Sequence, residues 1–409
     1  MTTRIVVLGA GYAGLSAANG IARQARGTTE VTLVNDRNTF TERVRMHQLA
    51  AGQTVRQRPV AELLGDAPVR FVVGRAVSID AAAREVALSD GSRLPYDTLV
   101  YALGSRAEAD AVPGAAAYGY PVADAEDAAR LRARIAEHRA EAAGTVAVVG
   151  GGLTGIETAT ELAESHPGLK VVLLTGGTLG AALSARGRRH LLRVLARLGV
   201  GIREDARVAE VREDGAVLAD GTLVPARTVV WTTGFRVPEL AREAGFAVDR
   251  HGRVRVDASL RSLSHPEVYA LGDAAAVRHP NGRQELRMAC ATGLPAAAHL
   301  ARVLPGARRP GRTGGAGGTG GTDPAERTLR FRYLNRCVSL GRKDALIQYV
   351  RADDTPVEFV LTGRVAALYK EVIVRTAFAA QRRPALLPLL SPPGGARAAR
   401  TGAVVSGGV

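Results

Sequence analysis

The chain has 409 residues, of which 46% are hydrophobic, 23% are charged and 47 are glycine, a composition typical of an α/β protein with many turns and two or three domains. Apolar runs stay below the roughly 18 residues that span a bilayer, and residues 1–4 leave no room for a signal peptide, so we expect a cytoplasmic protein. The net charge of +15 is accompanied by only 4% aromatic residues and no basic cluster with interleaved rings, which argues against nucleic-acid binding and favours charges spread over solvated faces.

The cysteines and histidines show no pattern of a reactive site. Cys290 and Cys337 lie far apart in the sequence, and no C-x-x-C pair occurs. The eight histidines are scattered, without the spacing of metal ligands. We therefore expect neither a redox-active dithiol nor a bound metal, and redox chemistry would belong to bound organic cofactors.

Residues 4–22, RIVVLGAGYAGLSAANGIA, read as an apolar strand, a glycine turn and a helix. The turn has the spacing G-x-G-x-x-G at Gly9, Gly11 and Gly14. In this motif the first glycine permits a tight turn, the second lets the backbone approach a pyrophosphate, and the third lets the helix pack on the strand. The phosphates lie at the helix N-terminus, where N–H groups are free and the dipole is positive.

A second strand is predicted at residues 30–34, and Asn35 and Asp36 follow it. A polar side chain at this place binds the ribose of the adenosine half of a dinucleotide. A polar turn after a strand would have the same composition, so either interpretation holds for each residue alone.

The segment 39–52 contains Arg43 and Arg45, whose planar guanidinium groups suit a pyrophosphate. A solvated helix is the alternative interpretation of this segment. Further strands are predicted at residues 69–79 and 94–104, with a hairpin at 85–91 between them.

Residues 146–164, VAVVGGGLTGIETATELAE, repeat the plan of residues 4–22, with Gly150, Gly152 and Gly155 in the same spacing. A single glycine motif is weak evidence of a nucleotide site. Here both copies have a strand before the turn and a helix after it, so the sequence predicts two dinucleotide sites.

The strand after the second motif, predicted at residues 170–174, ends at Thr175, Gly176 and Gly177. It offers no carboxylate for the ribose of NADH. Arginines that would suit the 2′-phosphate of NADPH follow at Arg186, Arg188 and Arg189. The choice between NADH and NADPH stays open at this point.

Two further strands end in glycine in a similar way, LVYALGS at residues 99–105 and TVVWTTGF at 228–235, which is a third repetition between the two halves. A later strand within residues 267–277, EVYALGDAAAV, ends at Gly272 and Asp273. The remaining elements expected before residue 305 are helices at 124–143 and 288–304 and β structure at 200–211, 216–223 and 254–260.

Residues 305–327 consist mainly of Gly, Thr, Pro and Arg and are expected to form a flexible excursion. Residues 329–350 alternate as strands, and 364–380 form an amphipathic helix. The residues expected on one side of this helix are Val365, Leu368, Tyr369, Val372 and Ile373. The helix would lie on a membrane surface, form the face of a homodimer or pack on its own domain, and the tail from Gln381 is expected to be mobile.

Taken together, these motifs make the chain resemble the two-dinucleotide flavoproteins, and among them the type II NADH dehydrogenases and their small bacterial relatives. The resemblance covers nearly the whole chain and rests on the two glycine motifs, LVYALGS, TVVWTTGF and above all VYALGD. It implies an α/β fold with two Rossmann-like domains, the second inserted in the first, and a smaller C-terminal α+β region. The implied bounds are 1–111 with 244–304 for the FAD-binding domain, 112–243 for the NAD(P)H-binding domain, 305–327 for the Gly-rich linker and 328–409 for the C-terminal region.

The resemblance also implies roles for individual residues. The aspartate of VYALGD is a ligand to the ribityl chain of FAD in this family, which implies the same for Asp273. Glu157 matches a glutamate associated with the nicotinamide end of NADH, although a carboxylate near a helix N-terminus also complements the dipole. Lys343 and Lys370 are implied near the flavin or acceptor pocket, with solvated lysines as the alternative, and N–H groups near Leu294 would stabilise the reduced flavin at N1. Glu157 and Lys370 are the weak catalytic candidates.

The cofactor contacts expected from the motifs and the resemblance fall into two sets. Those to FAD are Gly9, Gly11, Tyr12, Ala13, Gly14, Asn35, Asp36, Arg43, Val77, Leu103, Gly104, Gly272, Asp273 and Leu294. Those to NAD(P)H are Gly150, Gly152, Gly155, Glu157, Thr175, Gly234 and Phe235.

The expected reaction is hydride transfer from NAD(P)H to FAD, followed by electron transfer to a quinone or similar acceptor. Larger quinone reductases carry glutamines in the helix after Gly-Asp, whereas this chain has MACATGLP with Ala291. A soluble reductase of a ferredoxin-like protein or small molecule, and a flavin redox sensor without enzymatic activity, therefore stay open as alternatives. Contact of the C-terminal helix with the inner face of the membrane, and a homodimer, stay open as well.

Overall fold

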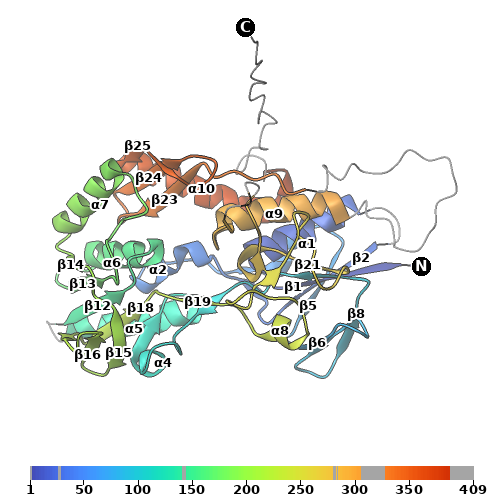
Figure 1. Ribbon diagram of the computed structural model, residues 1–409, viewed down its shortest axis with the longest axis horizontal. Coiled ribbons are helices and arrows are strands. Elements are labelled where there is room, and N and C mark those ends of the chain that lie inside the picture. Colours follow the sequence, from blue (N-terminus) through green and yellow to red (C-terminus); the bar gives the residue numbers. More distant parts are fainter. Residues whose placement is uncertain are drawn as a thin grey trace, which may run out of the picture.

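The computed structural model describes residues 2–25, 29–140 (138–140 as backbone only), 144–279, 282, 284–304 and 328–386. Its first parallel sheet contains the strands β1 (Thr3–Leu8), β2 (Thr29–Asn35), β5 (Val69–Val73), β9 (Thr98–Tyr101) and β21 (Val268–Ala270). They lie in the order β21-β9-β1-β2-β5 (Figure 1). The apolar, β-branched run of β1 takes the central place, because a parallel strand covered on both faces must be apolar along its length.

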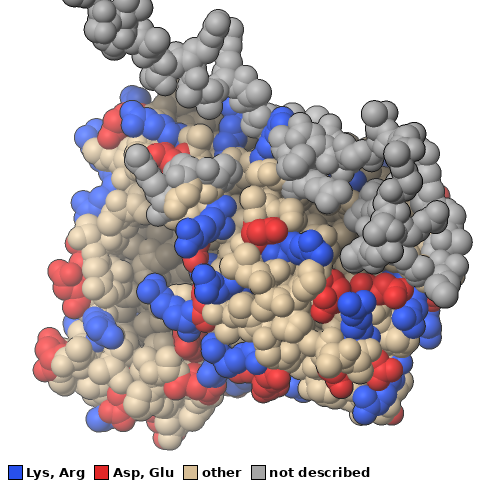
Figure 2. Space-filling model, turned by 45° about the vertical axis from the view of Figure 1, so that its right-hand side comes forward, with Lys and Arg blue, Asp and Glu red and all other residues tan. Residues whose placement is uncertain are grey.

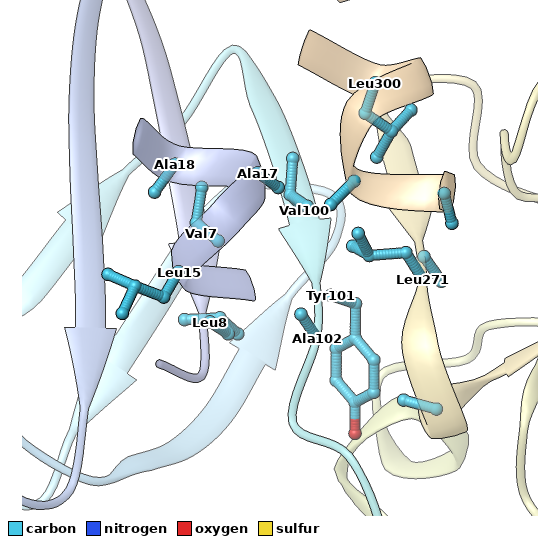
Figure 3. Close-up of a cluster of buried hydrophobic side chains, with 14 of the residues drawn as sticks. Val7, Leu8, Leu15, Ala17, Ala18, Val100, Tyr101, Ala102, Leu271 and Leu300 are labelled. Atoms are coloured by element: carbon cyan, nitrogen blue, oxygen red, sulfur yellow. The ribbon is translucent and has the colours of Figure 1, made fainter. Parts of the chain in front are cut away.

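The helices that pack together over this sheet are α1 (Tyr12–Gln24), α9 (Cys290–Val303) and α10 (Gly363–Arg382). The buried face of α1 includes Leu15 and Ala17, which lie near Val7 of β1 in Figure 3. Small residues let α1 and α9 approach closely, since a Cβ on Gly20 would lie only 2.7 Å from the Cβ of Ala301. Each fully buried leucine in this core contributes about 1.5–3 kcal/mol to stability.

A second parallel sheet repeats this plan in the order β11-β18-β12-β13-β14. Its strands are β11 (Gly119–Pro121), β12 (Thr145–Val149), β13 (Lys170–Leu174), β14 (Gly201–Arg203) and β18 (Thr228–Trp231). The larger helices of this half are α5 (Ala125–Ala140), α6 (Leu153–Ser165) and α7 (Ala185–Arg197). A small antiparallel sheet of β15 (Val208–Arg212), β16 (Gly215–Leu218) and β17 (Leu223–Pro225) follows β14.

The second sheet is inserted into the first. Strand β21 comes after the whole second sheet in the chain, yet it pairs in parallel with β9 of the first sheet. The chain leaves and re-enters at an antiparallel ladder of β10 (Arg106–Ala107) and β19 (Phe235–Arg236). The predicted fold class, two Rossmann-like domains with the second inserted in the first, is therefore confirmed, while the residue bounds of the two domains stay a prediction.

Two predicted elements are divided in the structure. The strand expected at residues 69–79 is β5 followed by β6 (Ala76–Asp80), and they are separated at Gly74, where a Cβ would lie 2.9 Å from the side chain of Leu88. The segment 39–52 is not one solvated helix. It consists of β3 (Thr39–Phe40), the 3-10 turn η1 (Arg43–Arg45) and the short helix α2 (Met46–Ala50), in which Met46, His47 and Gln48 are buried.

The remaining short elements complete the two halves. They are β4 (Arg58–Pro59), α3 (Val60–Leu64), β7 (Glu85–Leu88), β8 (Arg93–Pro95), α4 (Ala115–Tyr118), α8 (Leu240–Glu243), β20 (Val254–Arg255), η2 (Gly272–Ala274), β22 (Ala275–Ala276) and η5 (Pro384–Leu386). The predicted hairpin at 85–91 corresponds to β7 and β8.

The C-terminal region forms a layer above both sheets (Figure 1). It contains the antiparallel strands β23 (Asn335–Ser339), β24 (Ala345–Val350) and β25 (Pro356–Thr362), followed by α10. The predicted tail begins too early, because Gln381 lies in α10, is fully buried and accepts a hydrogen bond of 3.0 Å from Ser16 of α1. The predicted linker 305–327 and the chain from residue 387 lie outside the described residues.

Helix α10 packs on its own domain through a face that the sequence pattern did not indicate. The buried residues of the helix are Ala366, Val374, Ala377, Ala380 and Gln381. The predicted apolar stripe faces outward instead, and Val365, Leu368 and Val372 are 64%, 67% and 53% exposed. Small side chains allow α10 to lie close to α1, so the bulky ones remain on the outer face.

Charges of both signs are interspersed on the face seen in Figure 2. In the described part of the chain, no helix combines the length and the apolar character needed to cross a membrane.

Candidate functional site

The first glycine turn is shaped by two close approaches of the backbone. Gly9 follows β1 with a φ of +98°, and a Cβ there would lie 2.5 Å from the carbonyl oxygen of Ala102. A Cβ on Gly14 would lie 1.9 Å from the carbonyl oxygen of Gly9, so only glycine lets α1 pack on the turn. At Gly11, by contrast, no described atom lies within 4 Å of an added Cβ.

The second glycine turn has the same construction. Gly150 has a φ of +121°, and a Cβ on Gly155 would lie 1.8 Å from the carbonyl oxygen of Gly150. At Gly152 an added Cβ would again have no described atom within 4 Å. The sequence repeat is therefore a repeat of atomic geometry, with one open position at the start of each helix.

Both turns fit a dinucleotide pyrophosphate. Within the described residues no side chain caps α1 at Gly11 or α6 at Gly152, and neither first turn contains an acidic residue. The first N–H groups of each helix and its positive dipole end are therefore available to an anion. The open space at Gly11 and at Gly152 lets a phosphate approach the free N–H groups of each helix.

A polar cluster lies beside the first turn, at the carboxyl ends of β9 and β21. Asp273 in η2 accepts a hydrogen bond of 2.7 Å from the hydroxyl of Ser105, and its Oδ2 lies 3.8 Å from Nη1 of Arg43. Gly272 and Gly104 have φ values of +69° and +68°, and Gly272 approaches Ala13 of α1 closely. The structure thus brings together the predicted Arg43, Gly104, Gly272 and Asp273. Ser105 is an additional member that the LVYALGS motif contained.

Other predicted FAD residues have different surroundings. The side-chain oxygen of Asn35 accepts a hydrogen bond of 2.8 Å from the N–H of Ala10, so Asn35 supports the glycine turn. Asp36 is exposed after β2, and Val77 is 47% exposed on β6. Two further predicted residues are also well placed for the site, since Tyr12 is buried at the start of α1 and Leu103 packs partly buried against the core.

Helix α9 lies within the predicted range 288–304, and its start places Leu294 inside the helix. The helix begins at Cys290, so Leu294 is a buried core residue in its second turn. The N–H groups of Thr292 and Gly293 donate to the carbonyl of Ala289. The first N–H groups of this helix therefore belong to residues before Leu294.

Glu157 and Lys370 form a buried ion pair between α6 and α10. Oε1 of Glu157 also accepts a hydrogen bond of 3.0 Å from the N–H of Ser339 in β23. Burial alone would raise the pKa of Glu157, but the charge of Lys370 and the hydrogen bonds from Lys370 and from the N–H of Ser339 lower it. Glu157 is therefore an anion held against a buried ammonium group.

His47 of α2 extends this cluster, with Nδ1 3.9 Å from Oε2 of Glu157. Burial lowers the pKa of His47 to about 4, and the attraction of Glu157 offsets only part of this effect. The imidazole is thus neutral at physiological pH. The sequence analysis did not single out this residue, because it considered the segment for its arginines or as a solvated helix.

Arg45, which the sequence offered beside Arg43 as a pyrophosphate ligand, binds carboxylates instead. Its guanidinium group donates to Glu371 of α10 at 2.8 Å and 3.1 Å, and to Glu42 at 3.1 Å. Burial would raise the pKa of Glu371, but the hydrogen bond and charge of Arg45 lower it to about 2. Lys343 is exposed, so of the two candidate lysines only Lys370 belongs to the buried cluster.

A small pocket opens beside this cluster. It is lined by Val44, Gln48, Ser339, Gly341, Arg342, Asp344, Ala367, Lys370, Glu371 and Val374. The lining combines charged groups with aliphatic side chains of α10, whose outer face carries the exposed apolar stripe.

At the second turn, Thr175 follows β13 and is 8% exposed, and Gly234 has a φ of +73° beside Glu108. Phe235 of β19 is 41% exposed. Of the arginines predicted for a 2′-phosphate, Arg188 is already paired with Glu204 at 3.0 Å.

The two cysteines are free thiols in different places. Burial raises the pKa of Cys290 to about 12 and that of Cys337 to about 11. Both therefore remain protonated at neutral pH. Within the described residues, no group of three or more His, Cys, Asp or Glu side chains is placed to hold a metal ion.

Comparison with known proteins places the chain in a family. Residues 3–301 match the pyridine nucleotide-disulphide oxidoreductases. The chain is 36% identical over 313 residues to the NADH dehydrogenase-like protein MT1860 of Mycobacterium tuberculosis, an alignment that covers 72% of this chain and 78% of that protein. It is 25% identical over 391 residues to the alternative NAD(P)H-ubiquinone oxidoreductase C1, chloroplastic/mitochondrial, of Arabidopsis thaliana, covering 84% and 72%.

A solved structure shares the fold. NDH2 from Plasmodium falciparum in complex with NADH superposes with a TM-score of 0.76 at 15% identity, covering 94% of this chain and 98% of that one. The chain belongs to the pyridine nucleotide-disulphide oxidoreductase family, and the expected oxidoreductase activity with FAD and NAD(P)H is confirmed at the level of that family.

Proposed function

We propose that the protein takes reducing equivalents from NAD(P)H through FAD to a quinone. The observation that carries this proposal is the pair of equivalent glycine turns, each open at a helix N-terminus, together with the Asp273 cluster beside the first turn only. When bound, FAD accepts hydride from the nicotinamide and passes electrons to the acceptor. The domain at 1–111 with 244–304 would hold FAD, and that at 112–243 would hold NAD(P)H.

The residues of this chain would position the two cofactors and tune their reactivity. The N–H groups after Gly11 and Gly152 would hold the two pyrophosphates, and Arg43 would add a charge-assisted contact beside the first. Asp273, oriented by the hydroxyl of Ser105, would accept hydrogen bonds from the ribityl hydroxyls of FAD. Lys370, paired with Glu157, places its Nζ in the lining of the small pocket.

Quinone as the acceptor is supported by three features. Relatives of this chain are named as NADH dehydrogenase-like proteins and as an NAD(P)H-ubiquinone oxidoreductase. Lys370 lies beside aliphatic side chains of α10, where its Nζ is a donor for a carbonyl oxygen. The exposed stripe of α10 lies on the same helix as Lys370.

The test is anaerobic stopped-flow absorbance of the FAD-loaded protein. We expect NADH or NADPH to bleach the flavin absorbance band at about 450 nm. A short-chain ubiquinone analogue should then restore this absorbance within one turnover. Restoration by a ferredoxin or a small dye but not by the quinone would replace the proposed acceptor. A flavin that neither nucleotide reduces would overturn hydride transfer and favour a redox sensor.

The exposed stripe of α10 supports contact with the inner face of the membrane. We expect Leu368→Ser with Val372→Ser to weaken co-sedimentation with vesicles of phosphatidylglycerol and phosphatidylethanolamine by about tenfold, because two half-exposed apolar side chains would otherwise enter the interface. Leu263→Ser is the matched control, since Leu263 is 56% exposed and lies outside α10. Equal binding of all three proteins would contradict this contact, and a dimer that dissociates only in the double variant would assign the stripe to a second copy.

A further inference from the structure

The end of β13 is the place where a nucleotide's adenosine ribose would lie. Gly9 donates its N–H to the carbonyl of Val34, and Gly150 donates in the same way to the carbonyl of Leu174. Thr175 is therefore the structural equivalent of Asn35, directly after the second strand of its sheet. In dinucleotide folds a carboxylate here binds the 2′-hydroxyl of NADH, whereas an arginine nearby accommodates the 2′-phosphate of NADPH.

This place contains free space. A Cβ on Gly177 would have no described atom within 4 Å, and a Cβ on Gly176 would touch only Arg207, at 3.8 Å. Two acidic residues, Glu204 and the exposed Asp205, follow β14, and Glu204 is engaged through one carboxylate oxygen. Its Oε1 accepts hydrogen bonds from the N–H of Leu179 at 2.7 Å and from Arg188 at 3.0 Å.

Arg207 is fixed beside this space by the backbone. The N–H of Thr175 donates to the carbonyl of Arg203 at 3.0 Å, and the N–H of Ala206 donates to the carbonyl of Thr175 at 2.8 Å. These two bonds tie the segment that carries Arg207 to the end of β13. Arg207 is exposed, and in the described part of the chain it has no ion pair, so its guanidinium group is available to an incoming anion.

We infer that the hydride donor is NADPH and that Arg207 recognises its 2′-phosphate over Gly176 and Gly177. The inference rests on the proposed hydride transfer and names its donor. A planar guanidinium group suits a phosphate because it donates two parallel hydrogen bonds, and the two glycines leave room for the phosphate oxygens. The recognising arginine comes from the loop after β14, not from Arg186, Arg188 or Arg189, which the sequence suggested.

The first measurement is independent of hydride transfer. Isothermal titration of the FAD-loaded protein with 2′,5′-ADP and with 5′-AMP compares ligands that differ only in the 2′-phosphate. We expect 2′,5′-ADP to bind at least about tenfold more tightly, and Arg207→Gln to remove most of this difference. The matched control is Arg93→Gln, which removes the same charge from β8, outside the second parallel sheet.

The second measurement is the ratio of kcat/KM for NADPH to that for NADH. We expect this ratio to exceed about ten in the wild type and to fall about tenfold in Arg207→Gln. Gly176→Asp should reverse the preference for NADPH over NADH. The new carboxylate would repel the 2′-phosphate of NADPH and accept a hydrogen bond from the 2′-hydroxyl of NADH. Gly176→Asn tests the same volume without the charge and should keep the preference for NADPH.

The outcomes separate the inference from the proposed function. Flavin reduction by NADH together with equal binding of 2′,5′-ADP and 5′-AMP would overturn the inference and leave the function standing. Tighter binding of 2′,5′-ADP that depends on Arg207, with a flavin that no nucleotide reduces, would overturn the function and leave recognition of the 2′-phosphate standing. An equal loss with both donors in Arg207→Gln would overturn the assignment of Arg207.

Discussion

Gly152→Asp is expected to abolish reduction of the flavin by NAD(P)H while the protein stays folded and keeps FAD. Gly152 has a φ of −74° and a ψ of 178°, which any residue adopts, and no described atom lies within 4 Å of an added Cβ. Aspartate is a favourable residue at a helix N-terminus, so stability should rise by about 0.5 kcal/mol. Its carboxylate, however, takes the place of the pyrophosphate, and kcat/KM should fall by at least about a hundredfold.

Absorbance spectra, thermal unfolding and stopped-flow reduction check the three parts of this prediction. Gly168→Asp is the matched control, because Gly168 is exposed and an added Cβ there also has no described neighbour within 4 Å. The reciprocal variant Gly11→Asp should instead yield a protein without FAD. If Gly152→Asp were reduced as fast as the wild type, the second turn would not hold the nucleotide.

Lys370→Met is expected to lower the free energy of unfolding by about 3–5 kcal/mol at pH 8, because it leaves the carboxylate of Glu157 buried without its cation. In the wild type the pKa of Glu157 is lowered from 4.5, so its contribution to stability is present above that value and is lost as the pH falls through the folded-state pKa. Without Lys370, burial dominates and the pKa of Glu157 is raised. The contribution is then present below pH 4.5 and is lost as the pH rises.

The difference in unfolding free energy between wild type and variant should therefore grow from pH 5 to pH 8, measured by urea denaturation. The difference is the useful quantity, because burial also raises the pKa of Glu161 to about 7 in both proteins. The double variant Lys370→Met with Glu157→Gln should recover most of the lost free energy of unfolding. Lys343→Met, which replaces an exposed lysine, should change the free energy of unfolding little. A destabilisation that does not change with pH would show that packing, and not the buried charge, is the cause.

The glycine turns could be predicted because their signals are local. A strand, a turn and a helix within about 20 residues determine the positions of Gly9, Gly11 and Gly14, and the backbone alone makes the phosphate site. The role of Asp273 was implied instead by the resemblance of VYALGD to the family motif. The insertion of one domain in the other was implied by the resemblance to the two-dinucleotide flavoproteins, and the pairing of β21 with β9 confirms it.

The partners of the buried charges could not be predicted in the same way. Glu157 and Lys370 are 213 residues apart, and their pairing depends on how α10 lies on α6. The outer face of α10 shows the same limit. Its bulky residues gave the stronger periodic signal, but the small residues Ala377 and Ala380 fit against α1 and so became the buried face. Arg207 was missed because its position depends on two backbone hydrogen bonds to Thr175.

The hydrogen bonds between α1 and the end of α10 have a consequence for how the chain folds as it is synthesised. Asn19 donates to the carbonyl of Gln381, a residue 362 positions later. The inserted sheet is complete once β18 has emerged, at Trp231, whereas the enclosing sheet still lacks β21 and its helix α1 still lacks both α9 and α10. Because domains fold as units while a chain leaves the ribosome, the second nucleotide-binding sheet matures before the first. The N-terminal helix thus keeps an apolar face uncovered until translation is almost finished, and a chain truncated before α10 would present that face to chaperones and proteases.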